Sequence, residues 1–386
     1  MSPYDPRMTL LSRAATKMPT EHPVLAAAHR LAPRVASLSA EVESARRLPA
    51  ALAHELAGAG LFHLVVPERF GGFELHPALV IETLETLSRA DGSVGWCVMI
   101  GSLTAMCAAW LPEPVARAIY GVPDVITGGV AAPLGRAELV EGGYRVTGRW
   151  AWASGAQNCR WLTGGVVITQ DGTPQGTRVL YFPIEDVTLH DTWQASGLRG
   201  TGSVDMEVRD VFVPTERSLS LVTERPRVDR PLYRYPAYGL LAVGIPAVAL
   251  GIARRAIDEL TALGPAMATR PAVREAVAEA EATLRAARAL LLETVHATFE
   301  STTHQEATLR QRAELRLAYV HATRDAARVV DRMYELAGDS AVYNASPMQR
   351  CLRDIHAVTQ HAMVGQPLRE LIGAVLLGVD ANTATL

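Results

Sequence analysis

The hydrophobic periodicity of the chain changes twice along its length, and no other feature restricts its possible folds as much. Over residues 21–112, apolar residues recur at helical spacing, as at Leu48, Leu52 and Leu56. From about residue 120 to 226 the chain instead carries short alternating runs of β-branched and aromatic residues, bounded by Gly, Pro or Asp turns. After residue 233 the helical periodicity returns and continues nearly to the C-terminus.

This order of elements predicts an α+β protein with three domains, which suits a chain of 386 residues. We expect an N-terminal helical domain over residues 1–119, a small central β-barrel over 120–228 and a C-terminal four-helix bundle over 229–386. The last region is rich in alanine, which at contact positions lets helices approach closely, as in a tight bundle.

Composition and charge limit the classes of partner. A formal net charge of −3 argues against nucleic acid, which proteins bind by neutralising phosphates. No apolar run approaches the roughly 20 residues of a membrane span, and residues 1–23 lack the layout of a signal peptide. The four cysteines form no CxxC pair, so we expect buried thiols in a reducing cytoplasm and no metal site.

Three segments carry a family resemblance. YRVTGRWAWASGAQNCRW (144–161) holds an Ala-Ser-Gly turn among tryptophans, GLRGTGSVDMEVRDVFVP (197–214) is a Gly-rich β segment, and AGDSAVYNASPMQRCLRDIHAVTQH (337–361) places Arg-Asp ahead of a histidine. In this order they resemble the acyl-CoA dehydrogenase fold family, most closely its flavin-dependent, two-component monooxygenase branch. The resemblance implies a homotetramer that takes reduced FMN or FAD and O₂, forms a C4a-hydroperoxyflavin and oxygenates a small organic substrate.

Ser154 is the first candidate catalytic residue. A flavin hydroperoxide survives only where a hydrogen-bond partner lies near flavin N5 and water is excluded. A serine on a tight turn presents a short, rigid hydroxyl, and Trp150 and Trp152 would supply apolar walls. The resemblance places Ser154 near flavin N5 and the two tryptophans at the cofactor. The alternative is a strand-end serine that satisfies its own turn.

His361 is the second candidate catalytic residue. Its separation of seven residues from Asp354 would put both on one face of a helix. An imidazole that titrates near neutrality can act as a base on a substrate hydroxyl or amine, or can hold the distal peroxide oxygen. The monooxygenase branch carries a histidine at this place. The alternative is a capping or core histidine.

Further candidates surround these two residues. Thr201 and Ser203, in the Gly-rich segment, are expected to approach the flavin or the substrate entrance, unless they form a plain turn. Arg270 stands where the family places an arginine on the flavin phosphate of a neighbouring subunit, a task that suits a guanidinium, although a solvated surface arginine is the alternative. The candidate substrate-pocket residues are Trp96, Ser102, Gln157 and Asn158.

Two absences shape the choice of activity. The chain has no GxGxxG string for a nicotinamide cofactor, so a separate reductase is expected to supply reduced flavin. After His361 the only carboxylate of its segment is Glu370, whereas the dehydrogenases of this fold need a carboxylate base. A monooxygenase is therefore the leading hypothesis. An acyl-CoA dehydrogenase or oxidase with FAD, and a non-catalytic flavin-fold binding protein, remain alternatives.

One departure from the branch keeps the type of oxidation open. DGSVGW (91–96) matches an element after which many of these monooxygenases carry a second histidine, but no histidine follows in CVMIGSLTAMCAAW. Ser102 or Thr104 occupies that neighbourhood. The sequence alone therefore leaves both an oxygenase and an oxidase possible.

Overall fold

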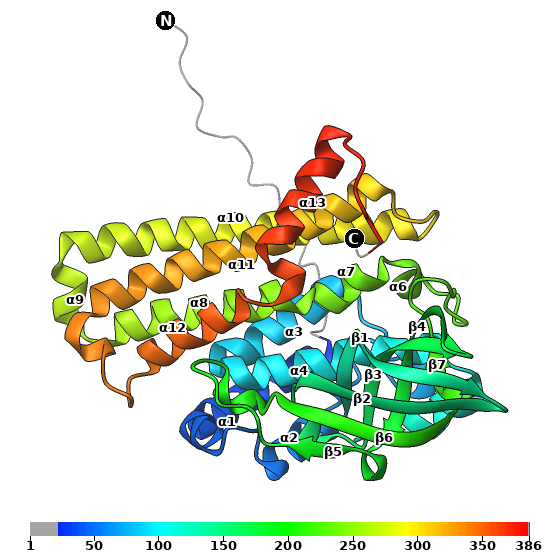
Figure 1. Cartoon of the computed structure of the whole chain (residues 1–386). Coiled ribbons are helices and arrows are strands. Elements are labelled where there is room, and N and C mark those ends of the chain that lie inside the picture. The colour runs from blue at the N-terminus through cyan, green and yellow to red at the C-terminus, as the bar shows by residue number, and fades with distance from the viewer. Residues whose placement is uncertain (1–21, 385) are drawn as a thin grey trace, which may run out of the picture.

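The computed structural model describes residues 22–384 and 386, so nearly all of the segment inspected for a signal peptide, residues 1–23, lies outside it. A seven-stranded sheet lies beside the N-terminal helices, and the long C-terminal helices form a layer above both (Figure 1). The N-terminal helices are α1 (Pro23–Ala45), α2 (Ala50–Gly58), α3 (Pro77–Ala90), α4 (Gly92–Thr104) and α5 (Glu113–Tyr120).

Helix α4 is the N-terminal element that reaches the candidate site. A single extended residue, Asp91, separates α4 from α3. Its carboxylate accepts a hydrogen bond from the Val94 backbone N–H at 3.0 Å. Aspartate is a preferred residue at this capping position. Nearly every residue of α4 is buried, including Trp96, because the helix is enclosed between α3, α8 and strand β1.

The central strands form one mixed sheet. They are β1 (Thr127–Val140), β2 (Gly143–Ala153), β3 (Trp161–Gln170), β4 (Thr173–Pro183), β5 (Thr188–His190), β6 (Val204–Pro214) and β7 (Ser218–Leu219). Their order is β5-β6-β2-β1-β3-β4-β7, and β1 pairs with β3 in parallel. In the described chain the end strands β5 and β7 are not hydrogen-bonded to each other, so the sheet is open where a small barrel was expected.

The C-terminal layer is the predicted helical bundle. Its long helices are α8 (Gly244–Ala262), α10 (Pro271–Thr302), α11 (Leu309–Ala337) and α12 (Pro347–Val358). Shorter helices accompany them, namely α6 (Pro231–Arg234), α7 (Ala237–Ala242), α9 (Pro265–Thr269) and α13 (Gln366–Leu377). Helix α8 packs against α3, α4, α11 and α12, and so joins the bundle to the N-terminal helices.

The predicted domain boundaries fall near changes of element. The division at 119–120 lies at the last residue of α5, and the division at 228–229 lies between β7 and α6. The buried apolar residues of all three regions belong to one continuous cluster. The three predicted regions therefore share one apolar core.

The expectation that no apolar run approaches a membrane span was wrong as a statement of length and composition. Within the described residues, the helical stretches Gly92–Ala109 and Ala237–Ala262 have mean hydropathies of 1.5 and 1.7, long and apolar enough to qualify. Their apolar windows are 89% and 83% buried inside the protein, as in the core helices of a globular fold.

Candidate active site

Ser154 lies at the end of β2, where strand, helix α4 and the loop before β6 meet. Its side chain is buried, and Gly155 follows with a left-handed φ of 73°, so the chain turns sharply here. The Trp96 indole Nε1 donates a hydrogen bond to Ser154 Oγ at 3.2 Å, and the Ser203 hydroxyl lies 2.7 Å from the same oxygen. The Gly155 N–H is bound to the Thr201 carbonyl at 2.8 Å.

The hydroxyl groups of Thr201, Ser203 and Ser154 form one row, and its last acceptor fixes the direction of every proton. Thr201 donates its only hydroxyl proton to the Leu198 carbonyl at 2.8 Å, so it must accept from Ser203, 2.6 Å away. Because the single Ser203 proton is donated to Thr201, Ser203 can only accept a hydrogen bond from Ser154. The Ser154 proton therefore points to Ser203. Ser154 Oγ, which also accepts from Trp96, therefore offers any further ligand a lone pair and no proton.

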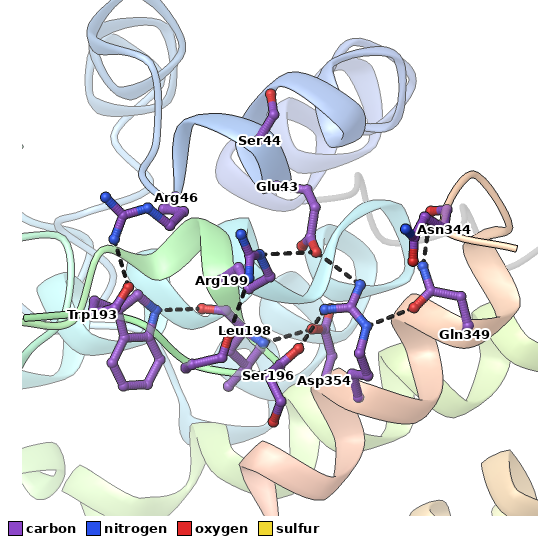
Figure 2. Close-up of polar contacts among 12 residues, drawn as sticks. Glu43, Ser44, Arg46, Trp193, Ser196, Leu198, Arg199, Asn344, Gln349 and Asp354 are labelled. Atoms are coloured by element: carbon purple, nitrogen blue, oxygen red, sulfur yellow. Dashed lines mark hydrogen bonds and ion pairs between the residues drawn. The ribbon is translucent and has the colours of Figure 1, made fainter. Parts of the chain in front are cut away.

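A buried carboxyl group holds the loop that carries this row. The Leu198 N–H donates to Asp354 Oδ1 at 2.6 Å, and the Leu198 carbonyl also accepts from the Trp193 indole at 3.1 Å (Figure 2). Leu198 has a left-handed φ of 48°, a conformation that these contacts must maintain. Burial, with the neighbouring Asp91 carboxyl, raises the pKa of Asp354 to about 8.

An arginine pair fastens the same loop to α1. Glu43 contacts Arg353 at 2.8 Å and Arg199 at 3.3 Å, and Arg353 also donates to the Ser196 carbonyl (Figure 2). A Cβ at Gly197 would lie 1.9 Å from the Arg353 carbonyl oxygen, so only glycine fits between loop and α12. Helices from both ends of the chain thus position the hydroxyl row.

The two tryptophans of β2 lie in different environments. Trp150 is fully buried among the strands, and its indole N–H donates to the Gly165 carbonyl at 2.7 Å, away from the hydroxyl row. Trp152 is 70% exposed and has a left-handed φ of 68°, at a register shift between β2 and β6. An exposed indole on a strained backbone residue thus lies two residues before buried Ser154.

His361 contacts Trp96, the residue that donates to Ser154, but it does not lie on the helix expected for it. The rings of Trp96 and His361 meet edge to face with centroids 5.6 Å apart. Helix α12 ends at Val358, so the expectation that Asp354 and His361 share a helical face was wrong. His361 instead caps the next turn, where its Nδ1 accepts from the Met363 N–H at 3.2 Å.

The protonation state of His361 follows from these contacts. Because Nδ1 accepts a hydrogen bond, the proton of the neutral ring must lie on Nε2. Burial, with the nearby Arg316 charge, lowers the pKa of His361 to about 4. At neutral pH the residue is a hydrogen-bond donor through Nε2 and a weak base.

The remaining predicted site residues make local contacts. Gln157 donates to the Gly202 carbonyl at 3.0 Å, Asn158 to the Leu48 carbonyl at 3.1 Å, and Ser102 to the Met99 carbonyl at 3.4 Å within α4. Arg270 is the residue before α10, and the one hydrogen bond of its guanidinium to the described residues is to the Met267 sulfur, at 3.5 Å. The structure therefore brings together Ser154, Thr201, Ser203, Trp96 and His361, and not Ser102 or Arg270.

Other side chains bear on the alternative chemistries. Glu370, the only carboxylate after His361 in its segment, is exposed on α13. Residues 22–384 and 386 contain no group of three His, Cys, Asp or Glu side chains that could hold a metal ion. Sequence reasoning missed Arg316, which is only 2% exposed. An arginine among apolar neighbours on an amphipathic helix was the available signal.

Comparison with known proteins identifies the family. Residues 20–111 match the N-terminal domain of acyl-CoA dehydrogenases and residues 243–366 their C-terminal domain. Indole-3-acetate monooxygenase of Pseudomonas putida is 34% identical over 83% of this chain and 84% of its own. The flavin-dependent monooxygenase oxygenase subunit HsaA of Rhodococcus jostii is 31% identical over 86% and 92%. The crystal structure of 3-HSA hydroxylase from Rhodococcus sp. RHA1 superposes with a TM-score of 0.91 at 30% identity, covering 95% and 100%.

N-terminal helices, a central mixed sheet and C-terminal helices, in this order, make up the acyl-CoA dehydrogenase fold. The chain belongs to the acyl-CoA dehydrogenase family and is most like its flavin-dependent monooxygenase branch.

Proposed function

We propose that this protein is the oxygenase component of a two-component flavin-dependent monooxygenase. It binds reduced flavin, FMN or FAD, and uses O₂ to insert one oxygen atom into a small organic substrate. One oxygen atom enters the substrate, the other leaves as water, and the flavin supplies the two electrons. The observation that carries the proposal is the orientation of the Ser154 hydroxyl, whose oxygen is left as an acceptor at the end of β2.

The residues fit a reduced flavin better than an oxidised one. Reduced flavin carries a proton on N5 and oxidised flavin does not. A hydroxyl that offers only a lone pair complements an N–H donor and repels a ring nitrogen that is itself an acceptor. Ser154 would therefore hold reduced flavin at N5, and Trp152 would lie against the ring system.

His361 and Trp96 would border the place where oxygen reacts. Trp96 supplies an apolar wall and fixes Ser154 by its indole N–H. The Nε2 proton of His361 has no partner among the described residues, so it is free to donate to an oxygen atom of the reacting species. This role as a donor suits a residue whose pKa is lowered to about 4 better than the role of a base.

Three further features belong to the proposal. A separate reductase would supply the flavin, since the sequence has no GxGxxG nicotinamide motif and HsaA is named as an oxygenase subunit. A homotetramer is supported by the family and by exposed apolar residues near α13, of which Leu377 is 82% exposed. A cytoplasmic location is supported by four free, buried cysteines.

The test is a single turnover with ¹⁸O₂. Purified protein is loaded anaerobically with chemically reduced flavin, then mixed with ¹⁸O₂ and a panel of small aromatic substrates, and product and hydrogen peroxide are quantified. The proposal expects one ¹⁸O atom in a product and suppressed peroxide release. Peroxide equal to the flavin oxidised, with no labelled product from any substrate, would indicate an oxidase or a binding protein instead.

A further inference from the structure

Arg316, on α11, is a buried cation that the site described so far does not use. Arg316 is 2% exposed. The only hydrogen bond of its guanidinium to the described residues runs from Nη1 to the Tyr238 carbonyl at 3.0 Å. Its Nε is buried without a partner, and no carboxylate of the described residues lies within salt-bridge distance. A guanidinium has five N–H donors, so most of the hydrogen bonds that it can donate are not made to the described residues.

Such an arrangement is unfavourable in the absence of a ligand. Buried charges in folded proteins are almost always paired, because desolvation of an unpaired ion is costly. Burial lowers the pKa of Arg316 to about 10, so the guanidinium remains protonated at neutral pH. The fold therefore maintains a positive charge whose counterion is not supplied by the described residues.

The position of Arg316 connects it to the candidate site. Helix α11 packs against α7, which carries Tyr238, and against the turn that His361 caps. Helix α7 in turn packs on α4, which carries Trp96. His361, which is close enough to Arg316 to feel its charge, therefore connects the Trp96 and Ser154 side of the site to the guanidinium.

We infer that Arg316 binds the carboxylate of the substrate, and that the substrate class is the small aromatic carboxylates. The inference rests on the proposed function, because it assigns a ligand to the same site. Arginine suits this task since its planar fork matches the two oxygens of a carboxylate. The aromatic part of such a molecule would lie toward Trp96 and His361, which the proposed function places beside the reacting oxygen.

The other arginines of α11 provide a comparison. Arg312 and Arg324 also have a buried Nε without a partner, but both are less buried than Arg316. Arg310 is 67% exposed and pairs with Glu314 on the surface of the helix. Arg310→Met therefore removes the same charge from the same helix without touching the interior, and is the matched control for Arg316→Met.

The experiment compares charged and neutral probes of one shape. Indole-3-acetate and indole-3-acetamide, and likewise phenylacetate and phenylacetamide, are titrated anaerobically into wild type, Arg316→Met, Arg316→Lys and Arg310→Met, with and without reduced flavin. Wild type and Arg310→Met should bind a carboxylate at least about tenfold tighter than its amide. Arg316→Met should bind both equally, and Arg316→Lys should recover part of the preference.

Stability separates binding from a structural role. Removal of an unpaired buried charge should leave Arg316→Met at least as resistant to thermal unfolding as wild type, while the stabilisation by added carboxylate disappears. The inference is overturned if wild type does not prefer any carboxylate to its amide, or if Arg316→Met keeps the preference. Oxidation of reduced flavin by O₂ is measured without substrate, so failure of the proposed function registers separately.

Discussion

The proton order of the hydroxyl row gives the sharpest prediction. Thr201 receives the Ser203 proton because its own proton is bound to the Leu198 carbonyl. In Thr201→Val this acceptor is lost, so Ser203 must donate to Ser154 instead, and the Ser154 proton turns outward. The Leu198 carbonyl keeps the Trp193 indole as a donor, so the change leaves no buried carbonyl without a partner.

Turning the Ser154 proton outward should weaken the binding of reduced flavin and strengthen the binding of oxidised flavin. Ser154 would lose its bond to the N5–H of reduced flavin and gain one to the bare N5 of oxidised flavin. At about 1 kcal/mol for each bond, the ratio of the two dissociation constants should change about 30-fold. Anaerobic titrations with reduced flavin and aerobic titrations with oxidised flavin, followed by protein fluorescence, measure the ratio.

Two variants complete this test. Ser154→Ala should weaken binding of reduced flavin and abolish the effect of Thr201→Val. Ser102→Ala removes a fully buried hydroxyl that donates within α4, and should leave the ratio unchanged. If Thr201→Val keeps the wild-type ratio while remaining folded, the proton order does not govern flavin binding.

Three other predictions follow from single residues. The folded Asp354 carboxyl holds its proton up to a pKa of about 8, whereas the unfolded carboxyl loses its proton near pH 4. Stability should therefore fall as the pH rises from about 4 to about 8, by roughly 1.4 kcal/mol per pH unit, and level off at higher pH. Asp354→Asn should flatten that fall in denaturant titrations, and an unchanged slope would contradict the assignment. His361 stays neutral above its pKa of about 4, so product formed per flavin oxidised should be constant from pH 6 to 8, whereas His361→Ala should raise peroxide release about tenfold. Trp152→Ala should weaken flavin binding with little loss of stability, whereas Trp150→Phe should lower stability by about 1–3 kcal/mol and leave flavin binding intact; the opposite pattern would refute the placement of the two indoles.

The order of helices and strands was predictable because hydrophobic periodicity is a local property. Pairing between distant strands is not local, and nothing in the sequence indicated that β1 and β3 run parallel or that the sheet stays open. Alternation along β2 puts Trp150 and Trp152 on one face. A left-handed residue at Trp152 breaks that alternation, and no sequence rule places an indole in such a conformation.

Site residues that lie in a recognisable motif could be predicted from the sequence. Residues whose role depends on their burial and neighbours in the folded protein could not. Ser154, Thr201 and Ser203 stand in recognisable segments. The contact of Ser154 with Ser203, 49 residues later, depends on the hydrogen bond by which Asp354 holds Leu198. His361 was placed on a helix because seven residues, about two helical turns, separate it from Asp354, yet the helix ends at Val358. The isolation of Arg316 depends on its distance from every carboxylate of the described residues, which a sequence does not contain.

The role of Ser154 can be tested by the distance from its Oγ to flavin N5. It can be measured in a crystal structure of the protein grown anaerobically with reduced flavin. We expect a separation of about 2.7–3.2 Å, with the Trp152 indole against the ring system. A flavin ring bound elsewhere, with Ser154 in contact only with Trp96 and Ser203, would contradict it.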